Sequence, residues 1–279
     1  MEVLATPDSM RAWSHERHRA GRTIGFVPTM GALHDGHLSL VTIAKQRCDD
    51  VVVSIFVNAL QFDRAADFDA YPRPIDDDVA RCAEIGVDAV YAPTTAVMYP
   101  AGFETHVEPG ALADVMEGAA RPGHFRGVTT VVTKLFAAVR PDVGVFGEKD
   151  FQQLAIIRRM AADLDLGVEI VGAPIVREAD GLAMSSRNLR LAAADRAAAA
   201  CIPRALDAAV GMAADGDDVD RLTAAARAVV DGEPRAELEY VAVFDPATLA
   251  PLQRLDGPAR VAIAVWFGEI RLIDNRPLR

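Results

Sequence analysis

Two histidines, His34 and His37, lie between an apolar run at residues 23–27 and an amphipathic run at 38–47. Side chains three residues apart share one face of the first helical turn. That turn also presents unpaired backbone N–H groups and the positive end of the helix dipole, which both favour phosphate. The pair therefore indicates a site for the phosphates of a nucleotide. The alternative is two histidines that merely cap a helix.

A second polar group, residues 147–150, directly follows the apolar run at 143–146. An extended Lys149 ammonium there would reach a phosphate and neutralise charge that develops during displacement. Gly147 would allow the backbone to approach a ligand closely. The alternative for Lys149 is an ordinary surface lysine.

Ser185, Ser186 and Arg187 supply two hydroxyl groups and a permanent cation. The neighbouring Asp180, Gly181 and Asn188 give this segment the composition of a loop. We expect a mobile loop that closes over the phosphates. An ordinary turn or helix cap is the alternative.

The amides of Gln61 and Gln153 carry both donors and acceptors, which suits a substrate with carboxylate and hydroxyl groups. Asp77 and Asp78, in the acidic run at 76–78, are candidate Mg²⁺ ligands. The run also opens a predicted helix, where acidic residues are favourable without any metal. That second interpretation suits at least two of the three aspartates better.

Short apolar runs alternate with helical stretches up to about residue 174, which is typical of a parallel α/β sheet. The predicted strands are 23–27, 51–57, 89–91, 143–146 and 168–171, and the predicted helices are 38–47, 76–85, 128–139 and 151–164. In such a sheet ligands bind beyond the carboxyl ends of the strands, where the polar groups above occur.

After residue 187 the pattern changes to Ala-rich helices with a break at 215–218, followed by strands at 237–244, 261–266 and 269–273. Helices and strands segregated in this way indicate a small α+β unit. We therefore predict an α/β domain over residues 1–175 and a smaller α+β domain over 176–279.

The net charge of -11 argues against general affinity for nucleic acid or anionic membrane, because either normally requires a basic face. The three cysteines show no metal or redox spacing and are expected to be reduced. The amino terminus lacks a basic segment followed by an apolar run, and no apolar stretch is expected to be long enough to span a bilayer. These features predict a cytoplasmic protein.

Together these motifs resemble the pantoate-β-alanine ligase family over nearly the whole chain. Residues 28–31 with 34–37 are similar to that family's form of the HxGH nucleotide signature, and residues 146–150 and 177–188 are narrower matches, the latter similar to its version of the KMSKS loop. The family pattern Asn-Pro-Met-Gln-Phe is changed here at Ala59 and Leu60. Neither change removes a polar contact, so we expect an effect on affinity rather than on reaction class.

The resemblance implies a Rossmann-type amino-terminal domain, a smaller carboxy-terminal lid domain and a homodimer. It implies pantoate at Gln61 and Gln153, with β-alanine near Gln61, and further lining residues at Asn58, Tyr71, Glu117, Arg121 and His124. The ATP-binding residues that it implies are Met30, Gly31, Ala32, Leu33, His34, Asp35, Gly36, His37, Gly147, Glu148, Lys149, Asp150, Val176, Met184, Ser185, Ser186 and Arg187.

The implied reaction is attack of the pantoate carboxylate on the α-phosphorus of ATP, with Mg²⁺ assisting the leaving group, to form pantoyl adenylate and pyrophosphate. β-Alanine then attacks the acyl carbon and releases AMP. His34, His37, Lys149, Ser185, Ser186 and Arg187 form one electrostatic clamp, with His37 also a candidate proton donor. The alternatives are a nucleotidyltransferase that leaves the nucleotide on a phosphorylated substrate, an aminoacyl-tRNA synthetase, and a nucleotide-sensing module.

Overall fold

The computed structural model describes residues 1–215 and 218–278. The chain divides into two compact units. Unit 1 contains Met1–Glu148 and Gln152–Pro174, and unit 2 contains Lys149–Phe151 and Ile175–Arg279.

Unit 1 contains a parallel sheet of six strands in the order β1-β4-β3-β2-β5-β6. The strands are β1 (Glu2–Leu4), β2 (Ile24–Thr29), β3 (Asp50–Ile55), β4 (Ala89–Tyr91), β5 (Val143–Gly147) and β6 (Glu169–Ala173). The predicted α/β class is confirmed, with all five predicted strands present. The short edge strand β1 was not predicted, because three residues carry too little periodicity.

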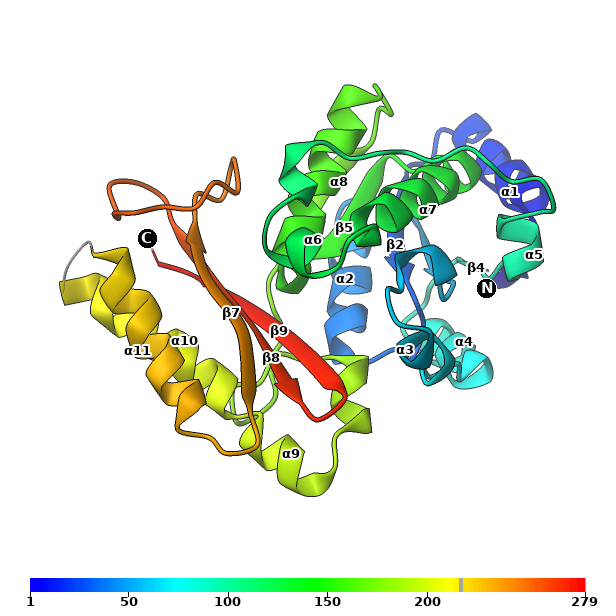
Figure 1. The fold of residues 1–279 in the computed structure, drawn as a ribbon. Coiled ribbons are helices and arrows are strands. Elements are labelled where there is room, and N and C mark those ends of the chain that lie inside the picture. Colours follow the sequence, from blue (N-terminus) through cyan, green and yellow to red (C-terminus); the bar gives the residue numbers. More distant parts are fainter. Residues whose placement is uncertain (216–217, 279) are drawn as a thin grey trace. The chain divides into compact units, whose positions relative to one another are not determined.

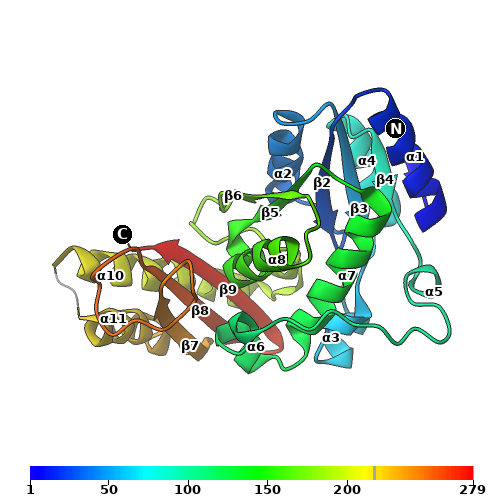
Figure 2. The ribbon, with the colours of Figure 1, turned by 90° about the horizontal axis from the view of Figure 1, so that it is seen from above.

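Helices cover both faces of this sheet. Those in unit 1 are α1 (Pro7–Arg19), α2 (Asp35–Lys45), α3 (Ala65–Asp69), α4 (Ile75–Glu84), α5 (Thr95–Met98), α6 (Met116–Ala120), α7 (His124–Val139) and α8 (Phe151–Asp163), whose first residue is assigned to unit 2. One apolar cluster joins α1, α7 and α8 to the sheet, and a second joins α2 and α4 to its opposite face. Figure 2 shows α2 on the other side of β2 and β3 from α1.

The alternating directions of the side chains along β3 explain why the sheet has one apolar cluster on each face. Val52 packs in the cluster with α7, whereas Val51 and Val53 pack in the cluster with α2. Successive strand side chains point to opposite faces, so a continuous apolar strand is what a sheet buried on both faces requires.

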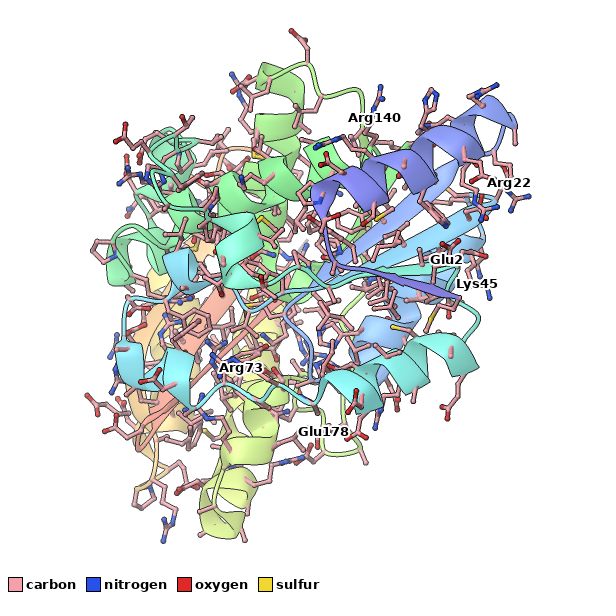
Figure 3. All side chains as sticks on the ribbon, turned by 90° about the vertical axis from the view of Figure 1, so that its right-hand side faces the viewer. Glu2, Arg22, Lys45, Arg73, Arg140 and Glu178 are labelled. Carbon is pink, nitrogen blue, oxygen red and sulfur yellow. The ribbon has the colours of Figure 1, made fainter. Side chains whose placement is uncertain are left out.

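The strand order reverses between β2 and β5. From β2 the chain moves outward through β3 to β4, whereas β5 continues to β6 on the other side. Ligands in open α/β sheets bind outside the carboxyl ends of the strands at such a point. Figure 3 shows Arg22 and Lys45 at the opposite, amino edge, where Arg22 pairs with Asp50 through two hydrogen bonds of 2.6 and 2.8 Å.

Unit 2 contains an antiparallel sheet of β7 (Glu237–Phe244), β8 (Arg260–Phe267) and β9 (Ile270–Pro277). Unit 2 also contains the helices α9 (Ala193–Ala198), α10 (Cys201–Asp215) and α11 (Val219–Asp231). Figure 1 shows α10 and α11 along one side of this sheet. The break predicted at 215–218 includes residues 216 and 217, which lie outside the described residues.

The expectation that no apolar stretch could span a bilayer was wrong for one segment. Ala193–Ala214, which covers α9 and most of α10, is long and apolar enough by length and composition. Its many alanines raise the mean hydropathy, while half of its most apolar window is buried inside the structure. Ala205, Leu206 and Ala209 pack there in the core of unit 2, so the segment has the character of a core helix.

Candidate active site

The loop from β2 to α2 is fixed by a buried carboxylate from α4. Asp78, 2% exposed, accepts the backbone N–H of Ala32 at 2.8 Å and that of Leu33 at 2.7 Å. Arg81 donates to the Leu33 carbonyl at 3.0 Å. Burial raises the pKa of the Asp78 carboxyl, and the two backbone donors oppose that rise. The loop backbone is therefore held by one side chain at both N–H groups.

Gly31 is required by this arrangement. Its φ is +83°, and a Cβ there would lie 2.8 Å from Oδ2 of Asp78 and 3.1 Å from Ile55. The next residue, Ala32, also has a positive φ of 50°. A non-glycine residue with positive φ stores backbone strain, and the hydrogen bond from Ala32 N–H to Asp78 offsets it.

His34 and His37 come together at the start of α2, as their spacing predicted. Their ring centroids are 4.1 Å apart, and the backbone N–H of His34 points to Nδ1 of His37 at 3.3 Å. A backbone N–H can only donate, so this Nδ1 is an acceptor and Nε2 carries the ring proton. Met30 precedes this first turn in the β2–α2 loop, and the exposed Asp35 is the first residue of the turn. The turn thus offers an imidazole N–H donor beside a helix amino terminus.

The proposed Mg²⁺ ligands sit in the first turn of α4. Asp77 is exposed, whereas both oxygens of Asp78 already accept backbone hydrogen bonds. The described residues contain no cluster of three or more His, Cys, Asp or Glu side chains placed to hold a metal ion. The metal role of Asp77 and Asp78 gains no support from this geometry and stays a prediction.

A polar network surrounds Gln61, in the 3-10 turn η1 (Ala59–Gln61) after β3. The carbonyl of Gln61 accepts from Arg121 at 3.1 Å and from Nδ1 of His124 at 2.8 Å. Its side-chain Oε1 accepts from Nδ2 of Asn58 at 2.9 Å. Arg121 also pairs with Asp63 at 3.0 Å and lies 3.9 Å from Glu117. The structure therefore brings Asn58, Gln61, Arg121 and His124 together.

Electrostatics within this network keep Asp63 ionised. Burial alone would favour its neutral form, but the Arg121 guanidinium lowers the pKa of the Asp63 carboxyl below its usual value. His124 has a fixed tautomer, because its Nδ1 faces a carbonyl and its Nε2 faces an Arg121 N–H at 3.3 Å. Only a neutral ring with the proton on Nδ1 satisfies both neighbours.

The remaining substrate candidates differ in surroundings. Tyr71 is 5% exposed and packs edge-on against Phe62, with ring centroids 5.7 Å apart. Gln153 is half-buried on α8. The neighbouring Gln152 is buried and bridges Glu117 N with the carbonyls of Leu112 and Val115. A lining role therefore remains open for Gln153 but not for Gln152.

Gly147 ends β5 and Glu148 follows it in unit 1, whereas Lys149 and Asp150 belong to unit 2. The Lys149 ammonium is 3.8 Å from Asp150, and its side chain is 19% exposed. The Lys149 carbonyl accepts a hydrogen bond of 2.9 Å from Asn275 of β9. Its backbone is thus anchored to the sheet of unit 2.

The segment expected to be a mobile loop forms an anchored hairpin in unit 2. Arg177 and Ala183 pair as an antiparallel bridge, and Met184 N donates to Val176 O at 3.0 Å. Arg177 also makes two hydrogen bonds, of 2.6 and 3.0 Å, to Asp274 of β9. Val176 and Met184 therefore lie at the base of a hairpin that is tied to the sheet.

Arg196 of α9 ties down the other side of this hairpin. It donates to Glu178 at 2.6 Å and to Asp180 at 2.6 and 3.1 Å. Glu178 in turn accepts from Asn188 at 2.6 Å, and Asn188 also donates to the Ala183 carbonyl at 3.1 Å. Hydrogen bonds from Arg196 hold the pKa of Asp180 below its usual range.

Ser185, Ser186 and Arg187 lie immediately after the hairpin. Ser185 caps the 3-10 helix η4 (Ser186–Arg190) by accepting from Arg187 N at 3.3 Å, and Ser186 is 7% exposed. The capping alternative raised for this motif therefore holds for Ser185. A capping hydroxyl keeps its own proton as a donor, so a phosphate role is compatible with it.

Sequence reasoning missed Tyr99, Gly127 and Asp63, which support the Gln61 network. Tyr99 lies 41 positions from Asn58 in the chain, yet its hydroxyl donates to Asn58 Oδ1 at 2.6 Å. The one local signal was Gly127, a glycine inside a helical pattern, which often marks close backbone approach.

The sequence model of the pantoate-beta-alanine ligase family matches residues 2–277. The chain belongs to this family. A pantothenate synthetase from Heliobacterium modesticaldum is 51% identical over 99% of this chain and 98% of its own length. One from Sphingopyxis alaskensis is 54% identical over 93% of each chain.

Solved structures agree with the family assignment. The crystal structure of pantothenate synthetase from Thermus thermophilus is similar to the whole chain, with a TM-score of 0.94, 44% identity and 99% of that chain covered. Pantoate-beta-alanine ligase from Francisella tularensis, complexed with beta-gamma ATP and beta-alanine, gives a TM-score of 0.83 at 34% identity, covering 100% of this chain and 98% of the other. Membership in the pantoate-β-alanine ligase family confirms the resemblance inferred from residues 28–37, 146–150 and 177–188.

Proposed function

We propose that the chain is a pantoate-β-alanine ligase, which condenses pantoate with β-alanine through a pantoyl adenylate and converts ATP to AMP and pyrophosphate. The observation that carries this proposal is the family match over residues 2–277. The structure adds a phosphate-compatible helix terminus at the switch point of the sheet of unit 1.

In the first step the pantoate carboxylate attacks the α-phosphorus of ATP. A carboxylate is already a competent nucleophile at neutral pH, so this step needs positioning and charge neutralisation rather than a base. The N–H groups that open α2 and Nε2 of His37 would bind phosphate oxygens. Because Nδ1 of His37 accepts from His34 N, the ring would serve as a hydrogen-bond donor. Releasing its one N–H proton would leave a costly imidazolate.

Unit 2 would supply the remaining cations and hydroxyl groups. We assign Lys149 and Arg187 to charge neutralisation and Ser185 and Ser186 to hydroxyl contacts with the phosphates. Since the hairpin before Ser185 is tied to both β9 and α9, this group would move as part of the unit rather than as a loose loop.

Pantoate would be held by Gln61 and Gln153, with Asn58, Tyr71 and Arg121 ordering the wall around it. In the second step the amine of β-alanine attacks the acyl carbon of the adenylate, the acyl–phosphate bond breaks, and AMP leaves. The amine nitrogen loses its proton as the amide forms.

Three further features belong to this proposal. Mg²⁺ would enter on the phosphate oxygens of ATP, because it keeps several waters and few protein ligands. The chain would form a homodimer, which sedimentation velocity would test. Its location would be cytoplasmic, in keeping with its acidic net charge and small-molecule substrates.

One incubation tests the reaction class. With ATP, Mg²⁺, pantoate and β-alanine, we expect equimolar AMP, pyrophosphate and pantothenate, and AMP release that depends on β-alanine. A nucleotidyltransferase would instead release pyrophosphate and retain the nucleotide on its product without forming an amide. Absence of β-alanine-dependent AMP would contradict the proposal.

A further inference from the structure

Two backbone groups fix the orientation of the Asn58 amide. Leu60 N–H, which can only donate, lies 3.3 Å from Asn58 Oδ1. The Gly127 carbonyl, which can only accept, lies 3.1 Å from Asn58 Nδ2. Asn58 is 1% exposed, so a reversed amide would bury two mismatched contacts. The Leu60 N–H and the Gly127 carbonyl therefore identify which end of the Asn58 amide is the oxygen and which is the nitrogen.

This orientation determines the polarity of Gln61. Asn58 Nδ2 donates to Gln61 Oε1 at 2.9 Å, which makes that oxygen the inner end of the amide. The outer end is Nε2, which carries two N–H groups. Gln61 is half-buried just beyond the carboxyl end of β3, and Nε2 has no protein partner within the described residues. The side chain offers a ligand donors only.

Tyr99 begins a relay of hydrogen bonds that runs from its hydroxyl through the Asn58 amide to the Gln61 amide. Its hydroxyl lies 2.6 Å from Asn58 Oδ1, and this is the shortest hydrogen bond that Asn58 makes among the described residues. The ring is held by Phe56, with centroids 6.0 Å apart, and by Phe103, at 4.9 Å. Burial raises the pKa of the Tyr99 phenol, so the hydroxyl keeps its proton as the donor.

We propose that Tyr99 is a positioning residue that acts through Asn58 to keep Gln61 Nε2 directed at an oxygen of pantoate. The inference rests on the proposed function of Gln61 as a pantoate contact. It also specifies which ligand groups Gln61 can bind: the group that faces its Nε2 must be a hydrogen-bond acceptor, such as a carboxylate or hydroxyl oxygen. An ammonium at that position would meet two N–H groups and be rejected.

The kinetic test uses Tyr99→Phe, with Tyr91→Phe as the matched control. Tyr91 is a buried tyrosine on β4 that makes no hydrogen bond to Asn58 or Gln61 in the described chain. For Tyr99→Phe we expect the KM for pantoate in pyrophosphate release to rise about threefold to tenfold, the scale of one hydrogen bond. The KM for ATP and kcat should stay near parental values. Tyr91→Phe should change neither KM.

A double-substitution cycle tests whether Tyr99 acts through Gln61. In a Gln61→Ala background, Tyr99→Phe should cause no further rise in the KM for pantoate. An undiminished rise there, or an equal rise for ATP, would overturn the proposal. Melting temperatures of all variants separate these effects from loss of fold.

Neutron diffraction of the deuterated protein tests the relay without activity. Deuterium should appear on Asn58 Nδ2 toward Gly127 O, on Tyr99 toward Asn58 Oδ1, and on the outer end of Gln61. A reversed Gln61 amide would refute the inference even if the protein makes pantothenate. Correct orientations in a protein that forms no pantoate-dependent AMP would instead refute the proposed function.

Discussion

At the scale of single residues, Asp78 shows how one acidic pattern suits two roles. Three consecutive aspartates predicted either metal binding or a helix start, and the structure places all three in the first turn of α4. The carboxylate of Asp78 is buried against the β2–α2 loop, where its hydrogen bonds hold residues that the proposed nucleotide site requires.

Asp78→Asn separates loop positioning from metal binding. The amide would place an N–H₂ against a backbone N–H, so we expect a loss of about 1–3 kcal/mol in unfolding free energy and weaker ATP binding. Asp77→Asn, on the same turn but exposed, is the matched control and should change stability little. Chemical denaturation and ATP titration at several Mg²⁺ concentrations are the measurements. If both variants raised the Mg²⁺ requirement equally, the metal role would be favoured instead.

His37→Ala and Lys149→Ala should each reduce adenylate formation about 10²- to 10³-fold, the usual scale for one lost transition-state contact. Both side chains lie at element ends rather than in an apolar core, so melting temperatures should stay near the parental value. Single-turnover pyrophosphate release measures the first effect. Near-normal release by either variant would return that residue to a capping or surface role.

At the scale of elements, α7 supports the turn that carries Gln61. A Cβ at Gly127 would lie 2.2 Å from Leu60 O and 2.6 Å from Gln61 N, distances that only backbone movement could relieve. The helix therefore approaches η1 at a distance that a glycine alone permits.

Gly127→Ala should push η1 away from α7 and raise the KM for pantoate more than that for ATP. Alanine normally stabilises a helix by up to about 1 kcal/mol relative to glycine, so a fall in melting temperature here would report the clash. Gly211→Ala on α10, where a Cβ would have open space, is the control and should be neutral or stabilising. A stable Gly127→Ala enzyme with unchanged KM values would contradict the prediction, because it would show that η1 and α7 can accommodate the added Cβ without disturbing the site.

The hairpin of unit 2 should loosen in acid. Because Arg196 lowers the pKa of Asp180, ionised Asp180 stabilises the fold above its ordinary pKa of 3.8, and this contribution disappears as pH falls through the lower folded value. The unfolding free energy of the parent minus that of Asp180→Asn should therefore be constant above about pH 5 and shrink below it. A difference that persisted unchanged down to about pH 2 would mean that charge pairing is not its origin.

At the scale of the whole molecule, the predictable parts were those with local signals. Periodicity identified the five main strands, and strand ends located His34, Gln61 and Lys149, because the carboxyl edge of a parallel sheet is a property of the fold class. The roles of Tyr99 and Asp63 could not be predicted from the sequence, because they depend on contacts between segments that are distant in the chain. Asp180, Gly181 and Asn188 favour turns and predict a mobile loop around Ser185 to Arg187. The anchors of the hairpin at 177–183, Arg196 and Asp274, lie 16 and 97 positions from their partners, so no local pattern indicates them.

The order of the two chemical steps follows from what each step requires. Attack at phosphorus requires only pantoate and ATP, so the adenylate should form before β-alanine arrives. We expect ¹⁸O-labelled pantoate to transfer one label to AMP. Without β-alanine, ATP labelled at the α,β-bridge should scramble its isotope, as bound pyrophosphate rotates and recombines inside a site that excludes water. Mass spectrometry or ³¹P NMR measures both. Scrambling seen only with β-alanine would favour a concerted or amine-gated route, and unlabelled AMP would exclude the acyl adenylate.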